Sequence, residues 1–166
     1  MGLRHPLVEK AYWWWMLRTS TTTTLSGLRF VYISAEGNRP RDEIQKTLED
    51  AIERIGRARG GFGELVTSHL RFVAALDVPS SSVAVHARGY ISPFPTMEAT
   101  NAHFLACRVI WAATFVRLTR DAMHAALPRD SESIRRAAYE AQLRFTKQFS
   151  DAQEWVEYLE RHPSGI

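Results

Sequence analysis

The stretch that most constrains the fold runs from Ala102 to Val116, where almost every residue is apolar and Arg108 is the interruption. It is shorter than the roughly 18–20 apolar residues that span a bilayer. Coiled as a helix, residues 104–118 carry apolar side chains around nearly the whole circumference: Phe104, Leu105, Val109, Ile110, Trp111, Phe115, Val116 and Leu118. A helix that is apolar all round is buried on several sides. We expect a sheet face and a helix to cover two sides, and either the tryptophan segment near residue 14 or a second copy of the chain to cover a third.

A second helix is expected after this one. The helical pattern runs from Met97 to about Leu127 and from Ser131 to about Arg161, with a short connection in which Asp130 is an expected N-cap. So short a connection predicts an antiparallel helical hairpin. The second helix carries a heptad seam, which predicts packing against the first helix: Ile134, Ala138, Ala141, Phe145, Gln148, Ala152, Trp155 and Leu159.

The middle of the chain, residues 28–92, predicts a small β-α-β-β unit. Leu28–Ser34 is rich in β-branched and aromatic residues, as strands are. Pro40 opens a helix that Gly60 and Gly61 end. Two further strands, Val66–Leu76 and Val83–Ile91, are predicted to form an antiparallel hairpin around the sequence DVPSSS, and SPFPT at 92–96 then breaks the chain.

The N-terminal segment, residues 1–27, is predicted to be an aromatic helix followed by a threonine-rich stretch. Pro6 suits the first turn of a helix that ends near Arg18, and Thr19–Ser26 indicates a linker or an edge strand. With residues 93–166 as the helical hairpin, the expected fold is α+β: an N-terminal helix, a β-α-β-β sheet unit and a long C-terminal antiparallel helical hairpin in a single globular domain.

Composition sets limits on function. The chain has 166 residues, 45% hydrophobic and 23% charged, which is typical of a folded soluble protein. Cys107 is the only cysteine, so an intramolecular disulfide and a cysteine-cluster zinc site are excluded, and a cytoplasmic location is expected. Arginine makes up 18 of the 21 basic residues, yet a net charge of +3 is too small to make nucleic-acid binding the default.

One face of the predicted hairpin is a candidate site for an anion or nucleic acid. Alternation along the two strands places five polar side chains together there: His69, Arg71, His86, Arg88 and Tyr90. Arg71 and Arg88 would lie directly opposite each other, which is unfavourable unless an anion lies between them. The alternatives are that acidic residues of the terminal helices cover this face, or that it is simply solvated.

Few residues point to catalysis. His103 and Cys107 share a helical face at i, i+4, but an isolated cysteine in an apolar helix is usually inert packing. The histidines lack the spacing of metal ligands, so neither a metal nor another cofactor is expected. The chain is therefore not expected to be an enzyme, although residues that meet only in three dimensions leave that open.

The excess of apolar and aromatic residues favours a protein that works by association. Five tryptophans are the candidate interface residues: Trp13, Trp14, Trp15, Trp111 and Trp155. The leading hypothesis is a non-catalytic, oligomeric protein–protein interaction or assembly subunit, which binds itself or another subunit. The alternative is a nucleic-acid binding module that uses the basic and aromatic sheet face.

Overall fold

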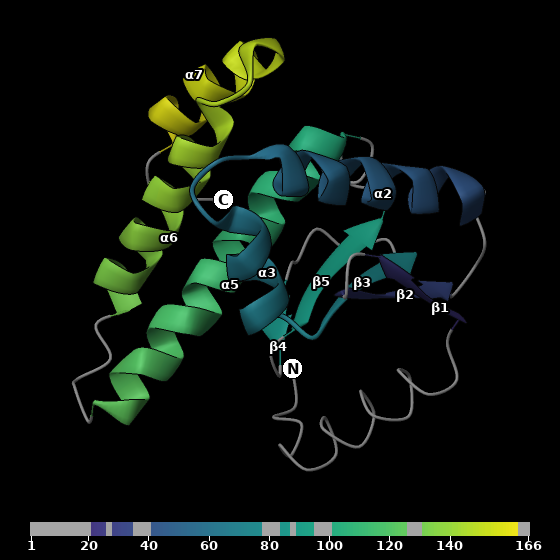
Figure 1. Cartoon of the computed structure of the whole chain (residues 1–166), viewed down its shortest axis with the longest axis horizontal. Coiled ribbons are helices and arrows are strands. Elements are labelled where there is room, and N and C mark those ends of the chain that lie inside the picture. Colours follow the sequence, from purple (N-terminus) through teal and green to yellow (C-terminus); the bar gives the residue numbers. More distant parts are fainter. Residues whose placement is uncertain are drawn as a thin grey trace, which may run out of the picture.

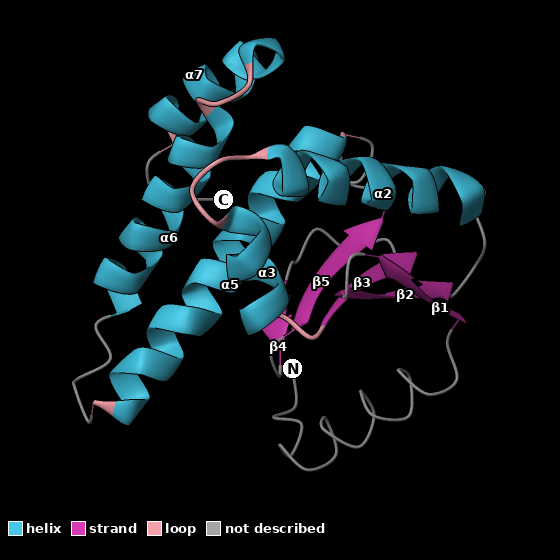
Figure 2. Cartoon of the chain, in the orientation of Figure 1, coloured by secondary structure: helices cyan, strands magenta, loops and turns pink. Residues whose placement is uncertain are grey.

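The computed structural model describes residues 21–25, 28–34, 41–77, 84–86, 89–94, 101–125 and 131–162. They form a helix-rich α+β arrangement (Figure 2). The strands are β1 (Thr21–Leu25), β2 (Leu28–Ser34), β3 (Phe72–Asp77), β4 (Ala84–His86) and β5 (Gly89–Phe94). The helices are α2 (Arg41–Arg57), α3 (Phe62–His69), α5 (Ala102–His124), α6 (Ser131–Thr146), the 3₁₀ turn η1 (Ser150–Ala152) and α7 (Gln153–Arg161).

The strands form one sheet in the order β1-β2-β3-β5-β4. The three inner strands β2, β3 and β5 run parallel, whereas β1 and β4 pair antiparallel with their neighbours at the two edges. In Figure 1, α2, α3 and α5 lie on the same face of this sheet. The threonine-rich stretch, for which the sequence left a linker or an edge strand open, contributes the edge strand β1.

Helix α2 forms as its sequence predicts. Asp42 and Glu43 lie in its first turn, where the positive end of the helix dipole favours acidic residues. Its apolar stripe is buried at Leu48, Ile52 and Ile55. Beyond its end, Gly60 and Gly61 adopt φ values of 90° and 75°, a backbone conformation that side chains with a Cβ rarely adopt. The glycine pair therefore turns the chain directly into α3.

The predicted strand start at Val66 is wrong, because Val66 lies in helix α3. Phe62, Val66 and Leu70 are all buried and are spaced four residues apart, which is a helical and not a strand repeat. The backbone N–H of Leu70 donates to the carbonyl of Val66 at 2.8 Å as the helix ends. The strand β3 begins only at Phe72.

The predicted hairpin between residues 76 and 83 is also wrong. β3 pairs in parallel with β2 on one side and with β5 on the other, and Val73 lies opposite Tyr90. The second predicted strand is divided into β4 and β5, which pair antiparallel with His86 opposite Gly89. Glycine weakens the interior of a long strand and is common where a hairpin turns.

The predicted break at SPFPT begins too early, because β5 continues to Phe94 with Pro93 opposite Leu76 of β3. β4 pairs with β5 only as far as Ile91. Proline lacks an N–H and is tolerated where one side of a strand has no partner. Pro93 lies in that position in the described part of the sheet.

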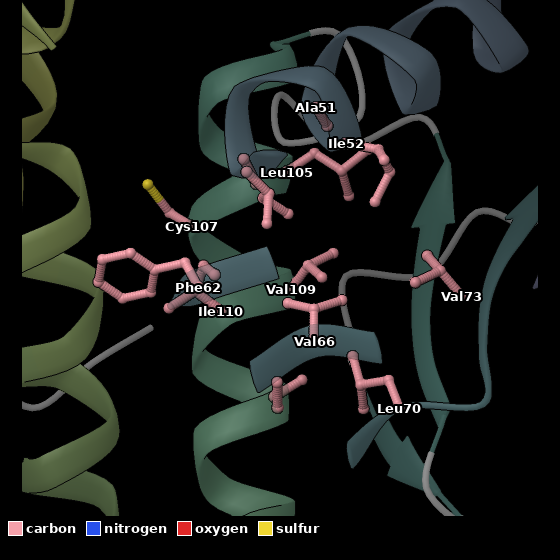
Figure 3. Close-up of a cluster of buried hydrophobic side chains, with 14 of the residues drawn as sticks. Ala51, Ile52, Phe62, Val66, Leu70, Val73, Leu105, Cys107, Val109 and Ile110 are labelled. Atoms are coloured by element: carbon pink, nitrogen blue, oxygen red, sulfur yellow. The ribbon is translucent and has the colours of Figure 1, made fainter. Parts of the chain in front are cut away.

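Helix α5 is the centre of the core, as its apolar sequence requires. The side chain of Asn101 caps its first turn by accepting hydrogen bonds from the backbone N–H groups of His103 and Phe104. Leu105, Val109 and Ile110 are almost completely buried, and Figure 3 shows them among side chains of α2, α3 and β3. Within the described part of the chain, α2 and α3 cover one side of α5 and α6 covers another. The tryptophan segment that the sequence offered for a third side lies outside the described residues.

The last predicted helix is two helices. α6 runs antiparallel to α5 and ends at Thr146, and the chain then passes through η1 into α7 (Figure 1). Gln148, expected in the buried seam, is exposed in this turn. Its amide accepts from the backbone N–H of Arg59 at 2.7 Å and donates to the carbonyl of Arg59 at 3.1 Å. Gln148 therefore ties the end of α6 to the loop between α2 and α3.

Several predictions lie outside the described residues: the N-terminal helix through Arg18, with Trp13, Trp14 and Trp15, and the N-cap at Asp130. Within the described part of the chain, no helix combines the length and apolar character needed to cross a membrane.

Candidate functional site

His103 and Arg54 are part of a polar junction between three elements, although they lie far apart in the sequence. Arg54 of α2 donates from Nη1 to Asp151 Oδ1 of η1 at 3.1 Å, and its Nη2 bonds the other carboxylate oxygen. The same Nη1 lies 3.2 Å from Nδ1 of His103 on α5. A guanidinium group can only donate, so Nδ1 accepts and the proton of the neutral imidazole is on Nε2. The three side chains are called the Arg54 junction below.

Aromatic rings enclose the Arg54 junction. The His103 ring stacks on Phe145 with a centroid separation of 5.6 Å and meets the edge of Phe149 at 5.4 Å. The Arg54 guanidinium lies 5.2 Å from the centre of the Phe149 ring. Burial, together with the positive charge of Arg54, lowers the pKa of His103 to about 4. His103 is consequently neutral at physiological pH and is poorly suited to proton transfer there.

Asp151 completes the junction electrostatically. Its hydrogen bonds to Arg54 lower the pKa of its carboxyl group, and the same contact raises the pKa of Arg54. The pair joins α2 to η1, and Nη1 of the same Arg54 also contacts His103 of α5. The arrangement fits a structural tie between α2, α5 and the turn that precedes α7.

Cys107 does not form a reactive pair with His103. Its side chain is buried and points toward α6 (Figure 3), where Sγ lies 3.1 Å from the hydroxyl oxygen of Thr146. Burial raises the pKa of the thiol to about 12. Because the thiolate is the nucleophilic form of cysteine, this site is inert in the folded chain.

We therefore expect native Cys107 to resist alkylation. Iodoacetamide at mildly alkaline pH should modify the folded chain at least about a hundredfold more slowly than the urea-unfolded chain, because the thiol is both protonated and buried. Mass spectrometry of quenched time points measures both rates. Equal rates under native and unfolding conditions would show that Cys107 is accessible, contrary to this structure.

The five residues of the predicted anion face do not share a sheet face. His69 ends α3, Arg71 precedes β3, and His86 and Tyr90 belong to β4 and β5. The register nevertheless brings part of the set to one end of the sheet, because Phe72, next to Arg71, pairs with Gly89, and Gly89 also pairs with His86. Arg88 lies outside the described residues.

Two of the five predicted interface tryptophans can be placed. Trp111 of α5 is half-buried and stacks on Phe115 at a centroid separation of 5.1 Å. Trp155 of α7 is half-buried and lies 4.8 Å from the ring centre of Phe104. Trp13, Trp14 and Trp15 are outside the described residues.

Trp155 belongs to a row of rings that becomes more exposed toward the end of α7. From Trp155 the row continues to Tyr158 at 6.0 Å, and Tyr158 stacks on His162 at 4.5 Å. Phe104 at its base is buried, whereas the side chain of Tyr158 is 36% exposed. We refer to Phe104, Trp155, Tyr158 and His162 as the aromatic patch.

A groove that sequence reasoning missed lies along α3. It consists of a pocket of about 320 Å³ between α3, α5 and α6 and an adjoining pocket of about 230 Å³. Gly61, Leu65 and Arg117 line both pockets. The signal in the sequence was Arg117, a charge on a largely apolar helix, together with the Gly60-Gly61 pair, which the pattern explained as a helix end. We refer to the two pockets as the α3 groove.

The described residues contain no group of three or more His, Cys, Asp or Glu side chains placed to hold a metal ion. Comparison of the chain with models of known families, with curated proteins and with solved structures found no match.

Proposed function

We propose that the chain is a non-catalytic protein that works by association, and that the aromatic patch of α5 and α7 binds a second copy of the chain. The observation that carries the proposal is the row of rings from Phe104 to His162, in which Tyr158 is exposed. Tryptophan and tyrosine are enriched in interfaces because they bury a large rigid area at little entropic cost.

Three features support α7 as the element that presents this surface. Val156 and Leu159 on its inner side are buried, and the Tyr139 hydroxyl donates to the carbonyl of Leu159 at 2.6 Å. Lys147 pairs with Glu160 at 2.9 Å. α7 is thus held on α6 by its own contacts, and Tyr158 on its outer side is exposed to a partner. Two identical patches related by a twofold axis form an isologous interface, the most common kind in homo-oligomers.

A charge in the aromatic patch is expected to weaken the association. Sedimentation velocity at micromolar concentration should show a dimer or larger species for the wild-type chain, and Tyr158→Glu should raise its dissociation constant at least about tenfold. Gln153→Glu is the matched control, because it adds the same charge to an exposed position at the start of α7. This control should leave the dissociation constant within about twofold of the wild-type value.

A wild-type chain that sediments as a monomer throughout would contradict self-association through the aromatic patch. Equal weakening by Tyr158→Glu and Gln153→Glu would also contradict it, because the effect would then be a general one of charge.

The second candidate function is binding of an anion or nucleic acid at the end of the sheet. It is favoured by the register, which brings His86 and Arg71 to the same end of β3 and β5, and by the exposure of Arg71. Nucleic acid that copurifies with the chain and dissociates at high salt would support this candidate instead, since contacts to phosphates depend strongly on salt. The ultraviolet spectrum of the purified protein measures copurified nucleic acid and can be recorded on the sample used for sedimentation.

A further inference from the structure

We propose that the α3 groove binds a small organic anion, a phosphate monoester or carboxylate carried on a compact apolar body, and that Arg117 and Arg144 hold its charged group. The larger pocket, at about 320 Å³, is within the range of small-molecule sites. Arg117 enters it from α5 and Arg144 from α6, so the two guanidinium groups come from different helices. The site shares no residue with the aromatic patch and is independent of the association proposed above.

The charges of the larger pocket favour an anion. Elsewhere in the described part of the chain, ion pairs with carboxylates are formed by Arg54, Arg57, Arg136 and Arg161. Arg117 and Arg144 form none within the described part of the chain. The one carboxylate lining this pocket, Glu140, pairs with Arg136 at 3.4 Å, and Glu64 lines the adjoining pocket together with Arg117. Two guanidinium groups without a carboxylate partner in one pocket match the bidentate recognition of a phosphate or carboxylate.

The remaining walls favour a ligand with an apolar body. Phe62, Leu65 and Leu118 supply aromatic and aliphatic surface in the same pocket as the two arginines. Phe62 is fixed by an edge-to-face contact with Phe145 at 5.4 Å, so this wall is rigid. Apolar side chains together with a few charged groups are common in small-molecule sites.

The glycine pair lies on the wall of the groove. Gly60 and Gly61 both line the larger pocket, and a Cβ built on Gly61 would meet no atom within 4 Å, so open space lies beside the backbone there. A side chain at either glycine would strain the left-handed backbone.

Calorimetric titration of the full chain with three probes tests the proposal. Phenyl phosphate and benzoate each join an anion to an aromatic ring, and benzyl alcohol is the uncharged counterpart. At low ionic strength we expect at least one of the two anions to bind and benzyl alcohol not to bind. Comparison of phenyl phosphate with benzoate distinguishes a phosphate ligand from a carboxylate ligand.

Arg117→Gln and Arg144→Gln are each expected to weaken binding of the anion about tenfold or more, because each removes a charge-assisted contact. The matched controls are Arg120→Gln and Arg135→Gln, which remove exposed arginines from the same two helices outside the α3 groove. These controls should bind within about twofold of the wild-type chain. Thermal unfolding without ligand checks that all four variants remain folded.

Two results would overturn the proposal. One is the absence of binding of both anions to the wild-type chain. The other is equal weakening by all four arginine substitutions, which would show only attraction to the net positive charge. Neither result bears on the sedimentation behaviour of the Tyr158→Glu variant, so the two proposals fail or succeed separately.

Discussion

Replacing Phe145 with alanine is expected to lower the free energy of unfolding by about 3–5 kcal/mol. Phe145 is fully buried, and its ring contacts Phe62 of α3, His103 of α5 and Phe149 of the following turn. Alanine would leave a cavity where these elements meet, beside the Arg54 junction. Since small domains are stable by only about 5–15 kcal/mol, this one substitution should bring the chain close to unfolding.

Urea denaturation followed by circular dichroism measures the change. Phe149→Ala is the matched control, because it removes the same side chain from a half-buried position immediately before η1. We expect it to cost about 1–2 kcal/mol, in proportion to its smaller buried area. An equal loss in the two variants would contradict the central position of Phe145 in the core.

Acidification is expected to destabilise the chain by up to about 3 kcal/mol through His103 alone. The pKa of this histidine is about 4 in the folded chain and 6.5 in an unfolded one. Between these values the unfolded chain binds more protons, so the free energy of unfolding falls as the pH falls. The stability that the neutral His103 side chain contributes is fully present above pH 6.5 and is lost as the pH falls through about 4.

His103→Gln tests this dependence. The variant keeps a hydrogen-bonding group beside Arg54 but cannot titrate, so its stability should fall less steeply between pH of about 7 and about 4. His162→Gln is the control, because it makes the same substitution at an exposed position. Urea midpoints across this pH range provide the comparison. A His103→Gln slope equal to that of the wild-type chain would exclude His103 as the responsible group.

Asp151 should add to the effect at lower pH. Its pKa is lowered by the hydrogen bonds from Arg54, so its contribution is present above its ordinary pKa and is lost only as the pH falls through the lowered value. The two groups act in the same direction and on the same junction. Acid should therefore loosen the attachment of α2 to η1.

The elements that were predicted correctly are those whose signals lie within one stretch of chain. β2 was expected at Leu28–Ser34 and is found there, because its side chains favour a strand whatever it pairs with. α2 follows from its acidic first turn, its apolar stripe and the glycines behind it. The burial of α5 follows from apolar side chains on every side of the helix.

The errors concern choices between partners. Alternation along residues 72–76 is satisfied by an antiparallel neighbour or a parallel one, and the rule that successive strands pair favoured the wrong choice. The α3 error arose from Val66, a β-branched residue whose helical spacing from Phe62 and Leu70 was the better signal. The predicted heptad seam continued through Gln148, but the chain turns there, and the Gln148 side chain bonds the α2–α3 loop instead.

The candidate sites also divide into features set by local sequence and features set by tertiary packing. The sequence alone determined that Cys107 would be an inert core residue, since this follows from the apolar character of its own helix. Only the tertiary structure decided that Arg54 would meet His103 and Asp151, which lie 49 and 97 positions further along the chain. It likewise decided that Arg117 and Arg144 would line one pocket. Local propensity and periodicity act over a few residues, whereas these contacts depend on how whole helices pack, and many packings satisfy the same local pattern.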